Sequence, residues 1–215
     1  MRKQILLVII IIAVIASISC SQGDKHVAKF EYFRYQGNDA YFDREIDPNK
    51  EFFNPVIAGF YPDPSIVRWR GDYYLVHSSF SLYPGVPIFK SSDLVNWKQI
   101  GHVLNRPSQL NLDGFQISSR IFAPAIQHNP FNDKLYMVTT CTWGIGNFYV
   151  TTSNPEEGWS EPVLLPQVKG IDPSIFFDDD GKAYILECAE PFGGANYSGE
   201  SSIVMHKFDW ENDVI

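Results

Sequence analysis

The sequence contains Asp63-Pro64-Ser65-Ile66 and, later, Asp172-Pro173-Ser174-Ile175, the same tetrapeptide twice. Each copy leads into the same order of features: an apolar strand-like segment, a turn that contains glycine, and a second apolar segment with tyrosine. These features occupy residues 66–76 after the first copy and residues 175–186 after the second. The tetrapeptide therefore marks the start of a repeated β-hairpin.

A third copy of the hairpin lies between these two, over residues 123–138, and begins with Ala123 in place of aspartate. Repeats of short hairpins are typical of β-propeller blades, because each small sheet buries its faces only against its neighbours. The innermost strand of every blade lines the central channel, so equivalent positions converge near the axis. We therefore predict that Asp63 and Asp172 face one pocket.

The remainder of each repeat also favours an all-β fold. From Asn54 onward, strand-like segments of a few residues alternate with Gly, Pro, Asn and Asp, and helical periodicity is lacking. A strand, a polar loop and a tryptophan recur in order and place Trp97 and Trp159 at matching points. We predict that both tryptophans pack between blades, because a large aromatic side chain is more often core than ligand platform.

Composition describes a globular protein without a polyanionic partner. Of 215 residues, 45% are hydrophobic and 20% are charged. The formal net charge is −8 and the sequence has no cluster of Lys and Arg, which argues against binding to nucleic acid.

The sequence gives no sign of a metal site. Cys141 and Cys188 lack the spacing of metal ligands, and we expect both to be free thiols, although an exported protein could form a disulfide between them. Residues 178–181, Asp-Asp-Asp-Gly, are interpreted as a hairpin turn. No metal and no cofactor is assigned.

The N-terminus predicts export. Basic residues precede an apolar run over residues 5–18, which is shorter than the roughly 20 residues that span a bilayer. The run ends in Ser19-Cys20, which resembles a bacterial lipobox, so we expect lipidation of Cys20; an ordinary signal peptide is the alternative. The predicted organisation is a lipoprotein signal peptide (1–20), a linker and leading segment (21–50) and the propeller domain (51–215). The mature protein is expected in the bacterial cell envelope, periplasmic or surface-exposed, contacting the membrane only through its lipid.

Residues 54–66, together with Ser92–Trp97 and Gly170–Ser174, resemble glycoside hydrolase family 43, and the resemblance extends from Asn54 to the end of the chain. It implies a five-bladed β-propeller, of which about three blades are present here. It also implies inverting hydrolysis of xylose- or arabinose-containing plant polysaccharides or oligosaccharides, as by β-xylosidases and α-L-arabinofuranosidases.

The same resemblance implies roles for four residues. Asp63 matches the general base, and Asp172 matches the aspartate that modulates the pKa of the acid and orients the sugar. Phe80 and Phe122 match aromatic walls of the sugar pocket, with ordinary core packing as the alternative. Phe122 replaces the tryptophan expected before Ala-Pro, which leaves the choice between xylose and arabinose open.

The family's general acid is a glutamate followed by Gly-Pro, and this sequence contains no Glu-Gly-Pro. We therefore expect the acid beyond Ile215, in a longer protein of which this chain is a C-terminally truncated part, and we do not expect full activity from this chain alone. The alternative is a non-catalytic, carbohydrate-binding propeller at the cell surface. Turnover by the longer protein would distinguish the two.

Overall fold

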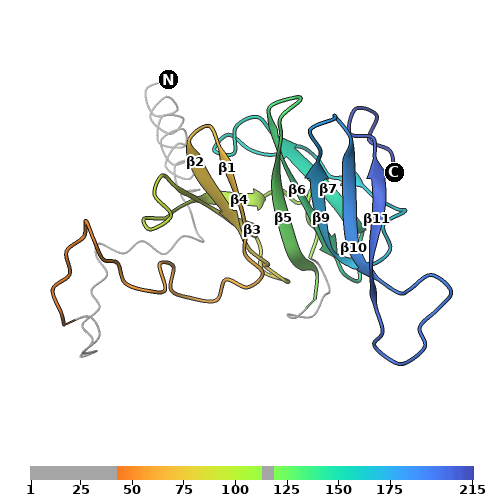
Figure 1. Ribbon diagram of the computed structural model, residues 1–215, viewed down its shortest axis with the longest axis horizontal. Coiled ribbons are helices and arrows are strands. Elements are labelled where there is room, and N and C mark those ends of the chain that lie inside the picture. Colours follow the sequence, from red (N-terminus) through yellow and green to blue (C-terminus); the bar gives the residue numbers. More distant parts are fainter. Residues whose placement is uncertain (1–42, 113–118) are drawn as a thin grey trace, which may run out of the picture. The chain divides into compact units, whose positions relative to one another are not determined.

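The computed structural model describes residues 43–112 and 119–215 (Figure 1). The chain divides between Ile46 and Asp47 into two units. All the strands of the described residues lie in the second unit, where they form three antiparallel sheets. The predicted all-β class is confirmed for this part of the chain.

The strands follow the chain order within each sheet, so that each sheet is built from successive hairpins. The first sheet contains β1 (Ser65–Trp69), β2 (Asp72–Val76), β3 (Gly85–Ser91) and β4 (Lys98–Leu104). The second contains β5 (Ile121–Asn129), β6 (Lys134–Cys141), β7 (Gly146–Thr152) and β8 (Val163–Leu164). The third contains β9 (Ile171–Phe177), β10 (Ala183–Ala189) and β11 (Ser202–Phe208).

The three repeated hairpins of the sequence are β1–β2, β5–β6 and β9–β10. The first turns through Arg70 and Gly71, both with positive φ, which is the conformation of the two-residue turns that match strand twist. The third turns through residues 178–181: the Asp178 N–H donates to the Lys182 carbonyl oxygen at 2.7 Å, and Gly181 has φ 85°. Asp-Gly at this position is therefore a turn, as predicted.

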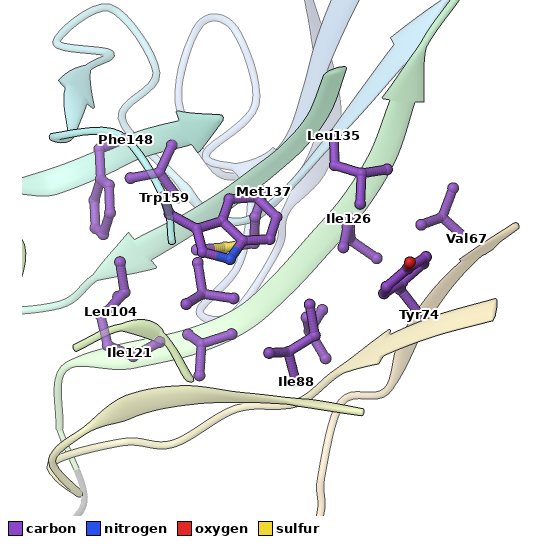
Figure 2. Close-up of a cluster of buried hydrophobic side chains, with 14 of the residues drawn as sticks. Val67, Tyr74, Ile88, Leu104, Ile121, Ile126, Leu135, Met137, Phe148 and Trp159 are labelled. Carbon is purple, nitrogen blue, oxygen red and sulfur yellow. The ribbon is translucent and has the colours of Figure 1, made fainter. Parts of the chain in front are cut away.

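The sheets pack face to face through their first strands, since β5 contacts both β1 and β9 (Figure 1). Apolar side chains on the alternate positions of these strands form two buried clusters, one between the first and second sheets and one between the second and third. Figure 2 shows the first cluster, in which Val67 and Ile88 of the first sheet meet Ile126 and Met137 of the second.

The two repeated tryptophans differ in burial. Trp159 is 5% exposed and lies in the cluster between the first and second sheets, as predicted (Figure 2). Trp97 is only partly buried, and its indole N–H donates to the carbonyl oxygen of Leu94 within its own loop at 2.9 Å. The expectation that both pack between sheets is therefore wrong for Trp97, because local hydrogen bonding holds its ring at the sheet's outer edge.

Cys141 is buried and Cys188 partly buried, and both are free thiols. Within residues 43–112 and 119–215, no helix has the length and apolar character required to cross a membrane. The same residues contain no group of three or more His, Cys, Asp or Glu side chains that could hold a metal ion. The predicted signal peptide and Cys20 lie outside the described residues.

Candidate active site

Asp63, Ala123 and Asp172 share an unusual backbone conformation. Their φ angles are 54°, 36° and 54°, and each residue precedes a proline at the start of the first strand of its sheet. Positive φ is uncommon outside glycine, and aspartate tolerates it better than most residues because its short polar side chain can hydrogen-bond locally. The three sequence repeats are thus equivalent in backbone geometry as well as in residue pattern.

The strand pairing is irregular at two of these three positions. Register shifts occur in β5 between Phe122 and Ala125, around Ala123, and in β10 between Leu186 and Cys188, opposite the start of β9. Such bulges interrupt the alternation of side chains across a sheet and re-aim individual side chains, often beside active sites. At Asp172, the bulge opposite β9 and the positive φ together account for an exposed carboxylate at the beginning of a strand whose alternate positions are buried.

Ser78 holds Asp63 in place and joins the first sheet to the second. Its hydroxyl donates to Asp63 Oδ2 at 2.5 Å and accepts the N–H of Ala123 at 2.7 Å. The Ser78 N–H also donates to the Pro62 carbonyl oxygen at 3.0 Å. Because Ser78 is 5% exposed, these bonds are shielded from water and fix one carboxylate oxygen of Asp63.

A second network holds the segment that leads into Asp172. The Gly170 N–H donates to Glu187 Oε2, and the amide of Asn147 donates to the Gly170 carbonyl oxygen at 2.8 Å. Glu187, 3% exposed, also bonds the ring Nε2 of His206 at 2.7 Å. A Cβ atom at Gly170 would lie 2.1 Å from a backbone carbonyl oxygen of β10, so only glycine fits there. The backbone two residues before Asp172 is therefore held on both sides.

The two aspartates influence each other electrostatically. Partial burial, and then the negative charge of Asp63, raise the pKa of the Asp172 carboxyl above its usual value. Both residues are nevertheless exposed to solvent. The charges of the two exposed carboxyl groups therefore interact in the folded chain, although 109 positions of sequence separate Asp63 and Asp172.

Three phenylalanine rings, Phe60, Phe80 and Phe122, contact one another at sequence positions close to Asp63, Ser78 and Ala123. The ring of Phe80 stacks on that of Phe60, with centroids 6.0 Å apart, and meets the ring of Phe122 edge to face at 5.5 Å. Phe80 and Phe122 are partly buried, and the Phe80 backbone bridges to Ile121 of the second sheet. The two aromatic residues singled out from the sequence thus contact each other across two sheets.

Sequence reasoning missed Phe60, Ser78 and the role of Glu187. Phe60 is 73% exposed and lies three residues before Asp63, so its position inside the Asn54–Ile66 motif was an available signal. Ser78 and Glu187 had no such signal, because their partners come from distant segments.

Comparison with known proteins supports the resemblance seen in the sequence. Residues 52–213 match the family "Glycosyl hydrolases family 43". A xylosidase/arabinosidase of Butyrivibrio fibrisolvens is 49% identical over 160 residues, which are 74% of this chain and 30% of that protein. A non-reducing end α-L-arabinofuranosidase of Bacteroides ovatus is 44% identical over 141 residues, 64% of this chain and 26% of that protein.

Solved structures show the same relationship. The crystal structure of a GH43_12 protein from a capybara gut metagenome superposes with a TM-score of 0.77 and 48% sequence identity. The match covers 83% of this chain and 34% of the other. The chain therefore spans about a third or less of the length of the relatives it matches.

Proposed function

Because this chain belongs to glycosyl hydrolase family 43, we propose that it forms part of the catalytic domain of an inverting glycosidase. The proposed substrates are xylose- or arabinose-containing plant polysaccharides or oligosaccharides, since the relatives are named for both sugars. The three sheets would be three blades of a five-bladed propeller. The coupling of two exposed carboxyl groups on equivalent strand starts is the observation that carries this proposal.

Asp63 is proposed as the general base. In an inverting reaction the base takes a proton from a water molecule as the water oxygen attacks the anomeric carbon, opposite the departing oxygen. The bond from Ser78 holds Asp63 Oδ2, so Oδ1 is the atom that would receive the proton.

Asp172 is proposed as the residue that modulates the acid and orients the sugar. A carboxylate near the proton donor raises the pKa of that donor and keeps it protonated until the bond between the anomeric carbon and the leaving oxygen breaks. The donor then gives its proton to the leaving oxygen, which balances the proton gained by Asp63. We propose that the donor is a glutamate encoded after Ile215, since the family's Glu-Gly-Pro motif is absent from this sequence.

Phe80 and Phe122 are proposed as a wall of the sugar pocket, and Phe60 extends the aromatic surface they form. The face of an aromatic ring packs well on the C–H surface of a pentose, because both surfaces are apolar and flat. Phe122 stands where the family resemblance predicts a tryptophan, so it offers the sugar a smaller aromatic surface. A change in sugar preference is the expected effect of that difference.

The reading frame, expressed to its stop codon, provides the protein for the test. Release of nitrophenol from nitrophenyl β-D-xyloside and α-L-arabinofuranoside is measured, and proton NMR of the first product reports inversion. Asp63→Ala should reduce kcat by about 10²–10⁴-fold, the usual contribution of general base catalysis. Unchanged circular dichroism is the control for folding.

Two results would speak against hydrolysis. A folded parent that releases no sugar contradicts the enzymatic proposal. Oligosaccharide binding that persists in Asp63→Ala, without turnover by the parent, would instead support the carbohydrate-binding propeller.

We further propose that Cys20 is lipidated and anchors the mature protein in the bacterial cell envelope. The support is the apolar run that ends at Ser19-Cys20. Labelled palmitate should enter the protein expressed in a bacterium and be lost in Cys20→Ser. A parent that takes up no label would favour an ordinary signal peptide.

A further inference from the structure

His77 is a buried histidine that directly follows β2 and precedes Ser78, the residue that holds the carboxylate of Asp63. Its side chain is 3% exposed and packs against two aromatic rings. The centroid of the imidazole lies 5.1 Å from that of the Tyr61 ring and 5.5 Å from that of the Phe89 ring in β3. An apolar side chain would fill this space without burying a polar group, so packing alone does not explain an imidazole here.

One ring nitrogen of His77 has a partner and the other has none. Nδ1 lies 3.1 Å from the carbonyl oxygen of Tyr61, and because a carbonyl oxygen can only accept, Nδ1 carries a proton and donates it. Nε2 is buried without a hydrogen-bond partner among residues 43–112 and 119–215. Burial lowers the pKa of His77, an effect that the bond to Tyr61 only partly opposes, so the ring is neutral at pH 7. Within the described part of the chain, the bond to Tyr61 is therefore the one polar contact that the side chain makes.

This bond completes a set that holds three successive residues. The carbonyl oxygen of Tyr61 accepts from the His77 ring. The carbonyl oxygen of Pro62 accepts the Ser78 N–H at 3.0 Å, and Asp63 accepts the Ser78 hydroxyl through Oδ2. Asp63 has φ 54°, a conformation that persists where the surrounding structure holds it. Two neighbouring residues at the end of β2 thus hold both the backbone and the carboxylate of the segment that carries the candidate base.

We propose that His77 is a positioning residue for Asp63, because its bond to the Tyr61 carbonyl oxygen fixes the backbone two residues before the candidate general base. The inference rests on the proposed function and adds a residue to those that set where Asp63 Oδ1 meets the water molecule. Tyr61 also directly follows Phe60, so the same bond holds the backbone beside the aromatic wall. A displacement of about 1 Å in a catalytic group can cost about 100-fold in rate, which makes one backbone hydrogen bond important.

The kinetic test uses two replacements of nearly equal size in the complete gene product. In His77→Asn the side-chain amide takes the place of Nδ1 and can donate to Tyr61, whereas His77→Leu has no donor. For nitrophenyl glycosides, kcat should fall roughly 10- to 100-fold in His77→Leu and stay within about 5-fold of the parent in His77→Asn. His102→Leu is the matched control and should leave kcat unchanged, since it removes a partly buried imidazole from β4, the outer strand of the same sheet.

A double-mutant cycle separates positioning from a general loss of packing. Adding His77→Leu to Asp63→Ala should leave the residual activity of Asp63→Ala unchanged, because no carboxylate remains to be positioned. An equal fractional loss of activity in the parent and in Asp63→Ala would overturn the proposal. Equal kcat values for His77→Leu and His77→Asn would overturn it too. Circular dichroism at the assay temperature checks that every variant is folded.

Hydrogen exchange tests the same bond without turnover. Without the Tyr61 bond the segment should open more often, so the Ser78 N–H, which bonds Pro62, should exchange about 10-fold faster in His77→Leu than in His77→Asn. Mass spectrometry of the peptide that contains Ser78 measures this, and equal rates would contradict the proposal whether or not the protein hydrolyses sugars. If Asp63→Ala loses activity while His77→Leu keeps the kcat and the exchange rate of the parent, the role of His77 alone is refuted and the proposed hydrolysis stands.

Discussion

Replacing Glu187 with alanine removes the acceptor of two hydrogen bonds from the interior of the third sheet. Gly170 N–H and His206 Nε2 both bond to this carboxylate, which is 3% exposed. Gly170 lies two residues before Asp172. Loss of Glu187 should therefore weaken the fold and release the backbone that positions a proposed active-site residue.

The expected loss of stability follows from the number and burial of these bonds. Breaking a buried, hydrogen-bonded pair by removing one partner costs about 3–5 kcal/mol, because the remaining groups stay desolvated. At about 1–2 °C per kcal/mol for a protein longer than about 250 residues, Tm of the complete gene product should fall by roughly 5 °C in Glu187→Ala. Glu187→Gln keeps an oxygen that can accept the Gly170 N–H and should lose only about 1 kcal/mol, or about 1–2 °C.

Activity should follow the same order as stability, with the parent highest, then Glu187→Gln, then Glu187→Ala. A shift of about 1 Å in a catalytic group can cost about 100-fold, so Glu187→Ala should lower kcat by roughly 10- to 100-fold at a temperature where it remains folded. Glu187→Gln should stay within about 5-fold of the parent if its role is positioning. Differential scanning calorimetry and nitrophenyl glycoside assays on the complete gene product measure both quantities. A Tm of Glu187→Ala within 1 °C of the parent (roughly 1 kcal/mol or less) would refute the reasoning.

Two further substitutions test the aspartates and their supports. Ser78→Ala removes the donor to Asp63 and the acceptor of the Ala123 N–H, so urea unfolding should show a loss of about 2 kcal/mol and kcat/KM should fall about 10-fold; unchanged stability would contradict this. Asp172→Asn should reduce activity yet increase stability at pH 7, by up to about 1 kcal/mol, since partial burial and Asp63 make the charged carboxyl unfavourable in the fold. Folding raises the pKa of Asp172, so the energetic cost of its charge in the fold is complete above the folded pKa. This cost disappears as pH falls towards the pKa of about 4 in the unfolded chain, where the parent and Asp172→Asn should be equally stable. A variant less stable than the parent at pH 7 would show that the carboxylate stabilises the fold.

The hairpin repeat could be predicted from the sequence because its signals are local. A turn such as Arg70-Gly71 depends on the conformations open to a few adjacent residues, and strand alternation has a period of two. The equivalence of Asp63 and Asp172 followed from the same repetition. The structure confirmed it down to the shared φ of 54°.

The similar loops that carry Trp97 and Trp159 show where local pattern becomes insufficient. Both follow a strand and a polar loop, yet only Trp159 is enclosed by the neighbouring sheet. Burial depends on which surface a loop meets after the chain has folded. Trp143 illustrates the converse, because its side chain is 85% exposed and nothing in its sequence neighbourhood distinguishes it from a core residue.

The sequence by itself determined the strands, the turns and the paired aspartates, since these depend on residue pattern within short segments. Only the tertiary structure decided which groups support the aspartates: Ser78 reaches across to Ala123, 45 residues away, and Glu187 reaches back 17 residues to Gly170. Hydrogen bonds and packing act over a few ångströms in space, whatever the separation along the chain. The surroundings of a site are therefore set by how the sheets come together.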